Sequence, residues 1–212
     1  MTDIYEANGC KFYAQDDMII RWERKYNRKF EQVTTEWLWS HLDGTFVDVG
    51  AATGWFLIPA AKRGFKAVGF DPNQAVFNRL QQNIELNGVD AEVHNVAVSA
   101  RSGKTTFWYN PKVPLTSGGS IEIATCHAPR QYEVDTVTLD DMVTEASVVK
   151  IDVEGHEMSV LSGAKNLIAN SRPALILEAN TEAHKKSLVH WMEKNEYVYS
   201  EADERNLLCL PI

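Results

Sequence analysis

The sequence predicts an α/β fold: a doubly wound, mixed sheet of seven strands that ends in an antiparallel hairpin. Three observations support this prediction. Short apolar runs alternate with stretches of helical periodicity along most of the chain. Several of these runs end in an acidic residue and a turn, as parallel strands do at the ligand-binding edge of open α/β sheets. The last two runs, Tyr197–Tyr199 and Leu207–Leu210, are joined by a short polar loop and predict the hairpin.

Composition and charge restrict the class of protein. A chain of 212 residues with 44% hydrophobic positions suits one domain, residues 1–212, with a sizeable core. The net charge of −8 argues against a broad nucleic-acid-binding surface. Three scattered cysteines without C-x-x-C spacing argue against a disulfide framework or a structural zinc site. Because the sequence shows neither a basic-then-apolar leader nor an apolar run of membrane-span length, we expect a cytoplasmic protein without a membrane partner.

Two segments lie outside the regular alternation. Residues 1–42 are expected to form an N-terminal helical extension, with a helix over about Arg28–Leu42. The predicted apolar stripe of this helix consists of Phe30, Val33, Trp37 and Leu38. Two interpretations of the basic segment RWERKYNRKF stay open. It is a solvated face with Trp22 and Tyr26 in the core, or it binds an anionic substrate and covers the site as a lid. Residues 110–131 are expected to form an irregular loop on the substrate side.

The stretch FVDVGAATGWF, residues 46–56, is the centre of the predicted site. Phe46–Val49 suits a buried strand, and a turn rich in glycine and alanine leads from it into a helix. Gly50 and Gly54 permit backbone conformations and close approaches that a side chain would block. A nucleotide-type ligand is therefore expected to lie against main-chain N–H groups at the helix start.

Asp48 and the spacing of the glycines decide which nucleotide is expected. A dinucleotide fingerprint reads G-x-G-x-x-G and holds a pyrophosphate, which a carboxylate at the end of the strand would repel. Ala52 replaces the middle glycine, and no Gly-Lys-Ser/Thr follows as in a P-loop. S-adenosylmethionine carries no phosphate, and its ammonium and sulfonium groups are attracted by an acid. The alternative is a plain strand-turn-helix with a solvated Asp48.

The next strands carry further candidate binding residues. Phe65–Phe70 is expected to be a strand that ends at Asp71, where a ribose diol would be hydrogen-bonded by a carboxylate. Asp71 is alternatively, or also, a helix N-cap with Pro72 at the first helical position. Ala91–Val98 is the third predicted strand, and its tip, Asn95–Ala97, would lie beside an adenine edge. Asp71 alone does not separate nicotinamide from adenosylmethionine cofactors.

The remaining elements follow from periodicity and turn signals. The other predicted strands are Thr105–Tyr109, Val134–Leu139, Val148–Asp152 and Pro173–Glu178. One further predicted helix carries the apolar stripe Val76, Phe77, Leu80 and Ile84 and ends at Asn87-Gly88. Another begins at Asn180-Thr181 and runs through Leu188 and Met192.

The stretch VVKIDVEGHE is the second chemically dense part of the sequence. Its buried strand is followed by Asp152, Glu154, His156 and Glu157, gathered in a turn and the start of a helix. In a doubly wound sheet this strand lies beside the first, so these groups would face the ligand of the glycine turn. Helix capping explains one of the acids but not the whole set. Lys150 is expected to pair with a neighbouring acid.

These motifs, in this order, resemble the FkbM-type methyltransferases, a family of O-methyltransferases. The similarity covers about Phe30–Glu178 and is carried by FVDVGAATGWF, GFDPN, HNVAVS and KIDVEGHE followed by L-x-G-A. It implies a Rossmann-like, class I methyltransferase sheet and S-adenosylmethionine as methyl donor. The cofactor contacts that it implies are Asp48, Gly50, Ala51, Ala52, Thr53, Gly54, Asp71, Pro72, Asn95, Val96, Ala97 and Asp152. Family members usually have Asn where this chain has Ala52 or Thr53, and Glu31 is a further candidate for cofactor contact.

The expected chemistry follows from the requirements of methyl transfer. A hydroxyl oxygen must lie in line with the sulfonium methyl group and must lose its proton. His156 has the unperturbed pKa that suits a general base, and Asp152 or Glu154 would orient it or act in its place. The segment after the fourth strand lacks the Asn/Asp-Pro-Pro-aromatic motif of many nitrogen methyltransferases, which favours oxygen as acceptor. The resemblance suggests a hydroxyl of a sugar or small molecule.

Three other functions stay open at this point. A metal-assisted O-methyltransferase would hold Mg²⁺ with Asp152, Glu178 and Asn180, although no metal site is predicted. A nicotinamide oxidoreductase is disfavoured by Asp48 and Ala52. A non-catalytic adenosylmethionine-binding module would keep the fold and lack turnover.

Overall fold

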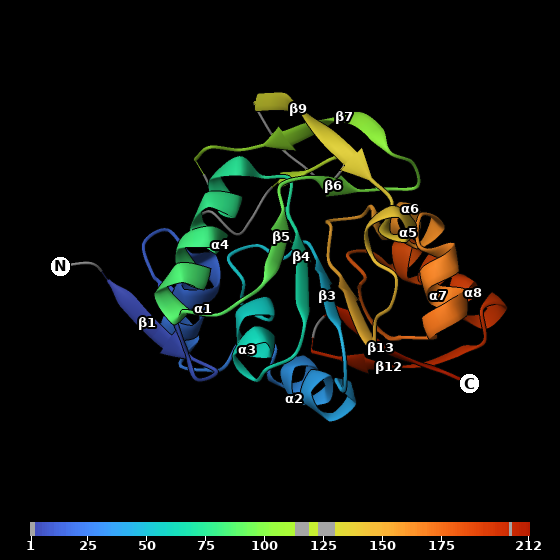
Figure 1. Ribbon diagram of the computed structural model, residues 1–212, viewed down its shortest axis with the longest axis horizontal. Helices are drawn as coiled ribbons and strands as arrows, with labels where there is room; N and C mark the ends of the chain where they lie inside the picture. Colours follow the sequence, from blue (N-terminus) through green and yellow to red (C-terminus); the bar gives the residue numbers. More distant parts are fainter. Residues whose placement is uncertain (1–2, 113–118, 123–129, 204) are drawn as a thin grey trace.

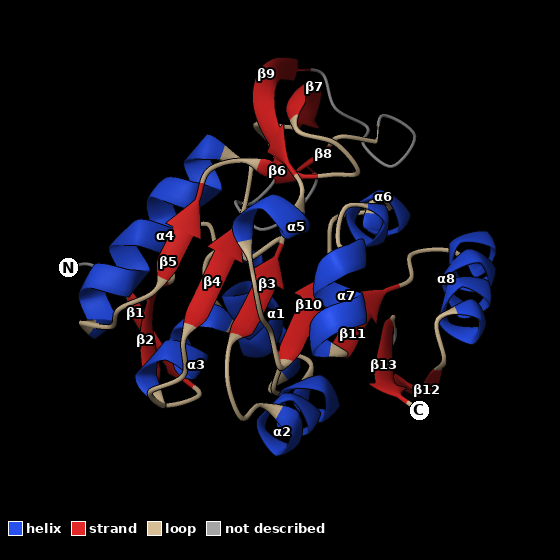
Figure 2. Cartoon of the chain, turned by 45° about the vertical axis from the view of Figure 1, so that its right-hand side comes forward, coloured by secondary structure: helices blue, strands red, loops and turns tan. Residues whose placement is uncertain are grey.

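The computed structural model describes residues 3–112, 119–122, 130–203 and 205–212. Its central layer is a seven-stranded sheet in the order β12-β13-β11-β10-β3-β4-β5 (Figure 2). The strands are β3 (Phe46–Val49), β4 (Ala67–Phe70), β5 (Glu92–His94), β10 (Val148–Ile151), β11 (Ala174–Glu178), β12 (Tyr197–Ala202) and β13 (Asn206–Pro211). All neighbouring pairs are parallel except those that involve β13. The predicted α/β class, mixed sheet and terminal hairpin are thereby confirmed.

Helices cover both faces of the sheet (Figure 1). The first face is covered by α1 (Met18–Tyr26), α2 (Gln32–His41), α3 (Leu57–Lys62) and α4 (Gln74–Asn87). The second face is covered by α5 (Leu139–Met142), α6 (Glu157–Ser162), α7 (Lys165–Ser171) and α8 (Glu182–Lys194). Alternate residues of each strand enter the two cores: Phe46 and Val148 belong to the first, and Val47 and Val149 to the second. The near-continuous apolar strands reflect burial on both faces.

The same alternation of side chains along the strands determines which face of the sheet Asp48 points to. Asp48 and Lys150 are register partners on the adjacent parallel strands β3 and β10. Each lies two residues beyond a strand residue of the first core, so both side chains point to the face that α1 and α2 cover. Both residues are buried. Two opposite charges are thus brought together beneath the N-terminal helices.

Two small sheets flank the main one. The N-terminal hairpin of β1 (Ile4–Ala7) and β2 (Cys10–Tyr13) was not predicted, because residues 1–42 were expected to be helical. Its signal was the Asn8-Gly9 pair, whose φ values of 52° and 75° are those of a type I′ turn. The second sheet, in the order β6-β9-β7-β8, lies beyond the carboxyl ends of β3, β4 and β5 (Figure 2). Its strands are β6 (Ala97–Val98), β7 (Gly103–Tyr109), β8 (Gly119–Ser120) and β9 (Arg130–Val137).

The predicted N-terminal helix is shorter than expected. It begins at Gln32, because Glu31 adopts a left-handed conformation with φ 42° and interrupts the helix there. Val33, predicted to pack on the sheet, is 53% exposed, whereas Leu38 is fully buried. Tyr26 was expected in the core and is 50% exposed.

Two expectations near the third strand also need correction. Ala91–Val98 is not one strand: β5 pairs with β4, and β6 leaves the main sheet to pair with β9. Asp71 is not the N-cap of α4, because Asn73 holds that position and accepts a hydrogen bond from Ala75 N.

The expected loop at 110–131 contains β8 and the start of β9, and its segments 113–118 and 123–129 lie outside the described residues.

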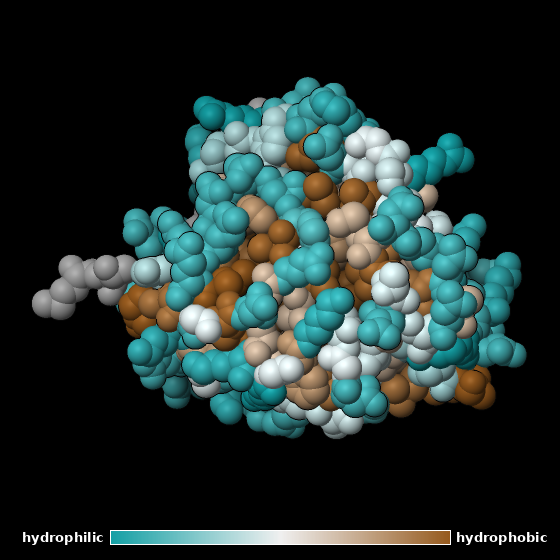
Figure 3. Space-filling model, viewed as in Figure 1, coloured by the Kyte–Doolittle hydropathy of each residue, from teal (hydrophilic) through white to brown (hydrophobic). Residues whose placement is uncertain are grey.

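The outer surface matches this layered core. On the face shown in Figure 3, hydrophilic residues cover most of the surface, and apolar atoms gather toward the middle. None of the helices in the described ranges is long and apolar enough to cross a membrane. Cys10 and Cys209, the two described cysteines, are both free and buried.

Candidate active site

A cavity of about 550 Å³ lies at the carboxyl ends of β3, β4, β10 and β11, a size typical of small-molecule sites. This is the edge at which the sheet order changes direction between β3 and β10. Residues of α1 and of the loop before α2 form one wall. The small sheet contributes Phe107 and Gly119, and Ile121 follows it. The predicted site residues on the cavity wall are Asp48, Gly50, Ala51, Ala52, Asp71, Pro72, Val96, Ala97, Asp152, Glu154 and His156.

The glycine turn is held close to the neighbouring strand ends. Gly50 N and Ala51 N both donate to Phe70 O, at 2.9 and 3.0 Å. Gly50 has a φ of +86°, and a Cβ there would lie 1.9 Å from Asp152 O. A side chain at position 50 therefore cannot fit without moving the β10 end. Ala52, a non-glycine residue with a φ of 48°, faces the cavity in the same turn.

Three predicted cofactor residues support the cavity wall from behind. Thr53 is buried, and its hydroxyl donates to Asp17 Oδ2 at 2.7 Å, which ties the turn to the start of α1. Gly54 packs against Ile58 and Leu80. Asn95 Nδ2 donates to Asp71 O at 2.8 Å. These residues do not line the cavity in the described structure.

Asp71 closes the turn from the end of β4. Its Oδ2 accepts from Ala52 N at 3.0 Å, and its Oδ1 accepts from Asn73 N at 2.9 Å. Burial raises the pKa of Asp71 to about 7, although both backbone hydrogen bonds oppose the shift. Each oxygen keeps a lone pair for a further donor such as a ribose hydroxyl.

An acidic cluster with one buried cation occupies the floor of the cavity. Lys150 Nζ donates to Asp152 Oδ2 at 2.7 Å. Burial raises the pKa of Asp48 to about 6 and that of Glu31 to about 7, and the Lys150 charge opposes both shifts. Asp48 Oδ1 and Glu31 Oε2 are buried without a hydrogen-bond partner among the described residues. Unpaired carboxylate oxygens of this kind are costly unless a cation or a donor joins them.

Glu178 and Asp152 extend this cluster. Burial and the neighbouring Asp152 raise the pKa of Glu178. Burial opposes ionisation of Asp152, but the Lys150 charge, the hydrogen bonds from Lys150 and Glu178 and the Arg205 charge together outweigh it and keep the pKa of Asp152 below its usual value. Arg205 Nη1 lies 3.6 Å from Glu178 Oε1 at the exposed edge. The pKa values of the two neighbouring carboxyl groups are thus shifted in opposite directions.

Glu154 and His156 have different surroundings. Glu154 has a φ of 56°, a strained value for a non-glycine residue, and its Oε2 accepts from Asn180 Nδ2 at 3.2 Å. Burial raises the pKa of Glu154. Both ring nitrogens of His156 are engaged, with Nδ1 2.6 Å from Glu122 Oε1 and Nε2 3.0 Å from Ser99 Oγ. Glu154 is thus the freer of the two groups to take a proton from a ligand.

Glu157 shapes the loop that carries these groups. Its side chain is fully buried, and Oε1 accepts from Val153 N at 3.0 Å and from Gly155 N at 3.2 Å. These bonds fix the backbone on either side of Glu154. The predicted pairing of Lys150 with a neighbouring acid is confirmed by its contact with Asp152.

The sequence alone did not reveal several parts of the cavity. The wall from the small sheet was missed: Thr105–Tyr109 was predicted as a strand, but no sequence signal placed Phe107 at the cavity. Trp55, Phe56 and Trp22 also line the cavity. Within the described ranges, no three His, Cys, Asp or Glu side chains are grouped as a metal site requires. Asn180, a proposed magnesium ligand, donates to Glu154 and is not on the cavity wall.

The sheet order, the glycine turn after β3 and the acid after β4 are features of the class I methyltransferase fold. The Methyltransferase FkbM domain matches residues 48–199, well over half of the sequence. The chain therefore belongs to the FkbM methyltransferase family.

Other comparisons agree with this family and fold. The hexuronic acid methyltransferase AglP of Haloferax volcanii is 28% identical over 131 residues, which are 59% of this chain and 52% of that protein. The crystal structure of methyltransferase FkbM from Methylobacillus flagellatus has a TM-score of 0.57 and 18% identity, and the match covers 78% of this chain and 43% of that one. The chain spans about half the length of these relatives.

A third relative acts on RNA. The tRNA (uracil(54)-C(5))-methyltransferase of Pyrococcus abyssi is 30% identical over 132 residues, which are 56% of this chain and 32% of that protein. Its crystal structure in complex with S-adenosyl-L-homocysteine has a TM-score of 0.53 and 16% identity, and the match covers 98% of this chain and 43% of that one.

Proposed function

We propose that the protein is an S-adenosylmethionine-dependent O-methyltransferase that acts on a hydroxyl of a sugar or small molecule. The observation that carries this proposal is a pair of buried carboxylate oxygens, of Asp48 and Glu31, that have no hydrogen-bond partner among the described residues and belong to the cavity that the glycine turn lines. A cationic, phosphate-free ligand relieves that unfavourable burial, whereas a pyrophosphate adds to it. The hexuronic acid methyltransferase among the relatives supports a sugar acceptor.

The cavity wall suggests where each part of the methyl donor binds. Asp71 faces the cavity with spare lone pairs and suits the ribose hydroxyls. Pro72, Val96 and Ala97 line the neighbouring wall and suit the adenine ring. The cluster around Asp48 suits the cationic methionine end. When bound, S-adenosylmethionine supplies an electrophilic methyl group.

We assign Glu154 as the group that accepts the proton of the acceptor hydroxyl. Its raised pKa brings it closer to neutral pH than an ordinary glutamate, as a general base requires. Asn180 orients one of its oxygens and Glu157 fixes the loop around it. Asp152 is a weaker base because Lys150 lowers its pKa, and we assign it to the donor side of the cavity. His156 forms the adjoining wall, held by Glu122 and Ser99.

Replacement of Glu154 tests this proposal. Glu154→Gln keeps the size of the side chain and removes the base, so kcat for methyl transfer should fall by about 10²–10⁴-fold. Affinity for S-adenosylhomocysteine should change by less than about threefold. Transfer of labelled methyl groups from S-adenosylmethionine to a panel of monosaccharides and their phosphates measures the rate, and calorimetry measures affinity.

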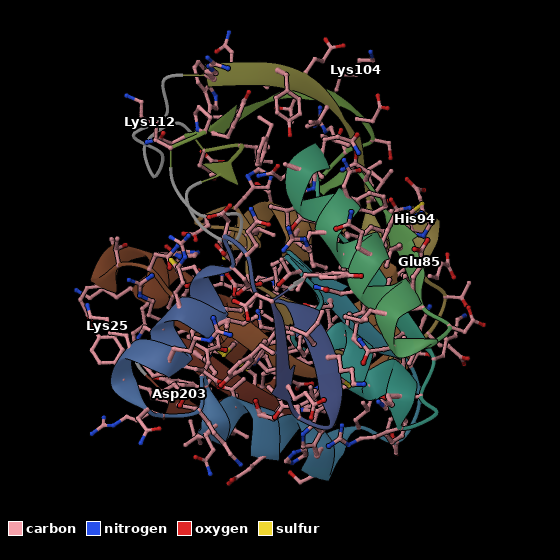
Figure 4. All side chains as sticks on the ribbon, turned by 90° about the vertical axis from the view of Figure 1, so that its left-hand side faces the viewer. Lys25, Glu85, His94, Lys104, Lys112 and Asp203 are labelled. Atoms are coloured by element: carbon pink, nitrogen blue, oxygen red, sulfur yellow. The ribbon has the colours of Figure 1, made fainter. Side chains whose placement is uncertain are left out.

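Glu85→Gln is the matched control, because Glu85 is an exposed carboxylate on the outer side of α4 (Figure 4). It should retain full activity. Equal rates for Glu154→Gln and the unmodified chain would exclude Glu154 as the base. Binding of S-adenosylhomocysteine without methyl transfer to any acceptor in the panel would favour the non-catalytic binding module.

A nucleic acid is a second candidate acceptor, because one relative methylates tRNA. The net charge of −8 argues against it, since RNA binding relies on basic surface. Methyl transfer to total tRNA, with no transfer to the sugar panel, would replace the sugar acceptor in our proposal.

A further inference from the structure

The loop between α1 and α2 is held in one conformation at the mouth of the cavity. Asn27, with a φ of 49°, ends α1, and Glu31 precedes α2 in the same left-handed region. Phe30 N donates to Glu23 Oε1 at 2.6 Å. Glu23 is itself buried and accepts from Tyr5 Oη at 2.7 Å. The N-terminal hairpin therefore fixes the loop through Glu23.

The side chains of this loop are divided between the interior and the rim. The Phe30 ring packs edge-on against Trp22 and Trp55, with ring centroids 5.8 and 6.4 Å apart. Glu31, after Phe30, is partly exposed as a residue but buries its Oε2 and feels the charge of Lys150, whereas Arg28 and Lys29, before Phe30, are exposed and still line the cavity. Two adjacent cations thus stand at the entrance.

These two cations have no ionic partner in the part of the chain that the structure describes. No salt bridge or side-chain hydrogen bond joins Arg28 or Lys29 to another described residue. Two other arginines of the same region are paired: Arg21 lies 2.6 Å from Asp16, and Arg24 lies 2.8 Å from Asp3. Unpaired cations that face a cavity, in a chain with a net charge of −8, can pair with an anionic ligand.

We propose that Arg28 and Lys29 form a subsite for an anionic group of the acceptor, a carboxylate or a phosphate. The assignment rests on the methyl transfer proposed above and narrows its substrate class to anionic hydroxyl compounds. Arg28 offers two parallel N–H donors to a planar or tetrahedral anion, and Lys29 adds a point charge. The acceptor hydroxyl then lies deeper, at Glu154, with the anion held at the rim.

Binding of three sugars tests the subsite. The probes are glucose, glucuronate and glucose 6-phosphate, titrated by calorimetry or NMR at equal ionic strength, with and without saturating S-adenosylhomocysteine. At least one of the two anionic sugars should bind about tenfold or more tightly than glucose, as charge-assisted hydrogen bonds allow. The comparison of glucuronate with glucose 6-phosphate identifies the carboxylate or the phosphate as the preferred anion.

Variants distinguish specific anion binding at Arg28 and Lys29 from nonspecific electrostatic attraction of anionic sugars to the protein. In the double variant Arg28→Gln/Lys29→Gln, the preference for the anionic sugar should fall below about threefold, consistent with the loss of both charges. Lys25→Gln is the matched control, because Lys25 carries the same charge on the outer side of α1 and does not line the cavity (Figure 4). It should keep the preference.

Three results would overturn the assignment. The first is equal binding of glucose and both anionic sugars to the unmodified chain. The second is a preference that survives in the double variant. The third is a loss of more than about tenfold in affinity for S-adenosylhomocysteine in the double variant, which would place Arg28 and Lys29 on the methionine carboxylate instead. Failure of the unmodified chain to bind S-adenosylhomocysteine would contradict the proposed function, while the titrations without it still decide the subsite.

Discussion

At the scale of single residues, the cavity is dominated by carboxyl groups that burial keeps from ionising freely. Asp48, Glu31 and Asp71 have pKa values raised to between about 6 and about 7, with burial as the main cause. Lys150 lies among them and forms a salt bridge with Asp152. In this cluster the buried carboxyl groups therefore outnumber the buried cation Lys150. We interpret this excess of acidic groups as preparation for a cationic ligand.

These raised pKa values predict how the stability of the ligand-free protein depends on pH. Between the ordinary pKa of about 4 and the raised values near 7, the folded chain binds protons that the unfolded chain has released. The free energy of unfolding should therefore fall as pH rises through this interval, by at least about 1–2 kcal/mol from pH 5 to 7.5. Urea denaturation at a series of pH values measures this slope.

Glu31→Gln is the control for that slope. It removes one buried titrating carboxyl group whose Oε2 has no hydrogen-bond partner among the described residues. The fall in stability between pH 5 and 7.5 should become smaller in this variant. A free energy of unfolding that rises over the same interval in the unmodified chain would contradict the burial of these groups as acids.

At the scale of elements, the glycine turn after β3 depends on its close approach to the end of β10. The two strands are adjacent and parallel, and Asp152 N donates to Val49 O at 2.9 Å. The turn must then pass over the backbone of Asp152, and only glycine at position 50 leaves room. The binding turn and the acidic loop are in this way built as one unit.

Gly50→Ala tests this dependence. Its Cβ would lie 1.9 Å from Asp152 O, so we expect a loss of about 2–4 kcal/mol in the free energy of unfolding and weaker binding of S-adenosylhomocysteine. Gly64→Ala is the matched control, because Gly64 has a φ of +90° and nothing lies within 4 Å of its Cβ position. That variant should lose only about 1 kcal/mol, from backbone strain alone. Equal losses in both variants, measured by urea denaturation, would show that the contact with Asp152 is unimportant.

The elements also show what local sequence can and cannot predict. Val148–Ile151 and Ala174–Glu178 are apolar apart from Lys150 and Glu178, so burial on both faces made them visible as strands. Ala91–Val98 looked like one strand because its apolar pattern continues across Asn95. Its division between two sheets depends on tertiary contacts, the pairing of β6 with β9 and the bond from Asn95 to Asp71 O.

At the scale of the whole molecule, the order of the strands places the site residues together. Asp48, Asp71, Asp152 and Glu178 lie at or just after the carboxyl ends of four strands that are adjacent in the sheet, although they span most of the sequence. Sequence motifs could predict these residues because strand ends are marked by acids and glycines. The partners of His156 could not be predicted, since Glu122 and Ser99 come from distant segments that only the folded chain brings near.

The cavity can also be divided into a proposed cofactor part and a proposed acceptor part. In our proposal, the methyl donor is bound by the glycine turn and the acidic cluster, whose residues line the cavity and lie mostly within the range that matches the family. We propose that the acceptor side is formed by the N-terminal loop, with Arg28 and Phe30, and by Phe107 of the small sheet with Ile121 just after β8. On this proposal, substrate choice depends on segments in which the sequence shows no family motif.

The central claim is that Asp48 selects a positively charged, phosphate-free adenosyl ligand. Calorimetry with S-adenosylhomocysteine and NADH tests this claim. The unmodified chain should bind S-adenosylhomocysteine and show no heat with NADH. Asp48→Asn should weaken that binding about tenfold or more, while Asp43→Asn, at an exposed position just before β3, should leave it unchanged. Tight binding of NADH, with no binding of S-adenosylhomocysteine, would contradict the account.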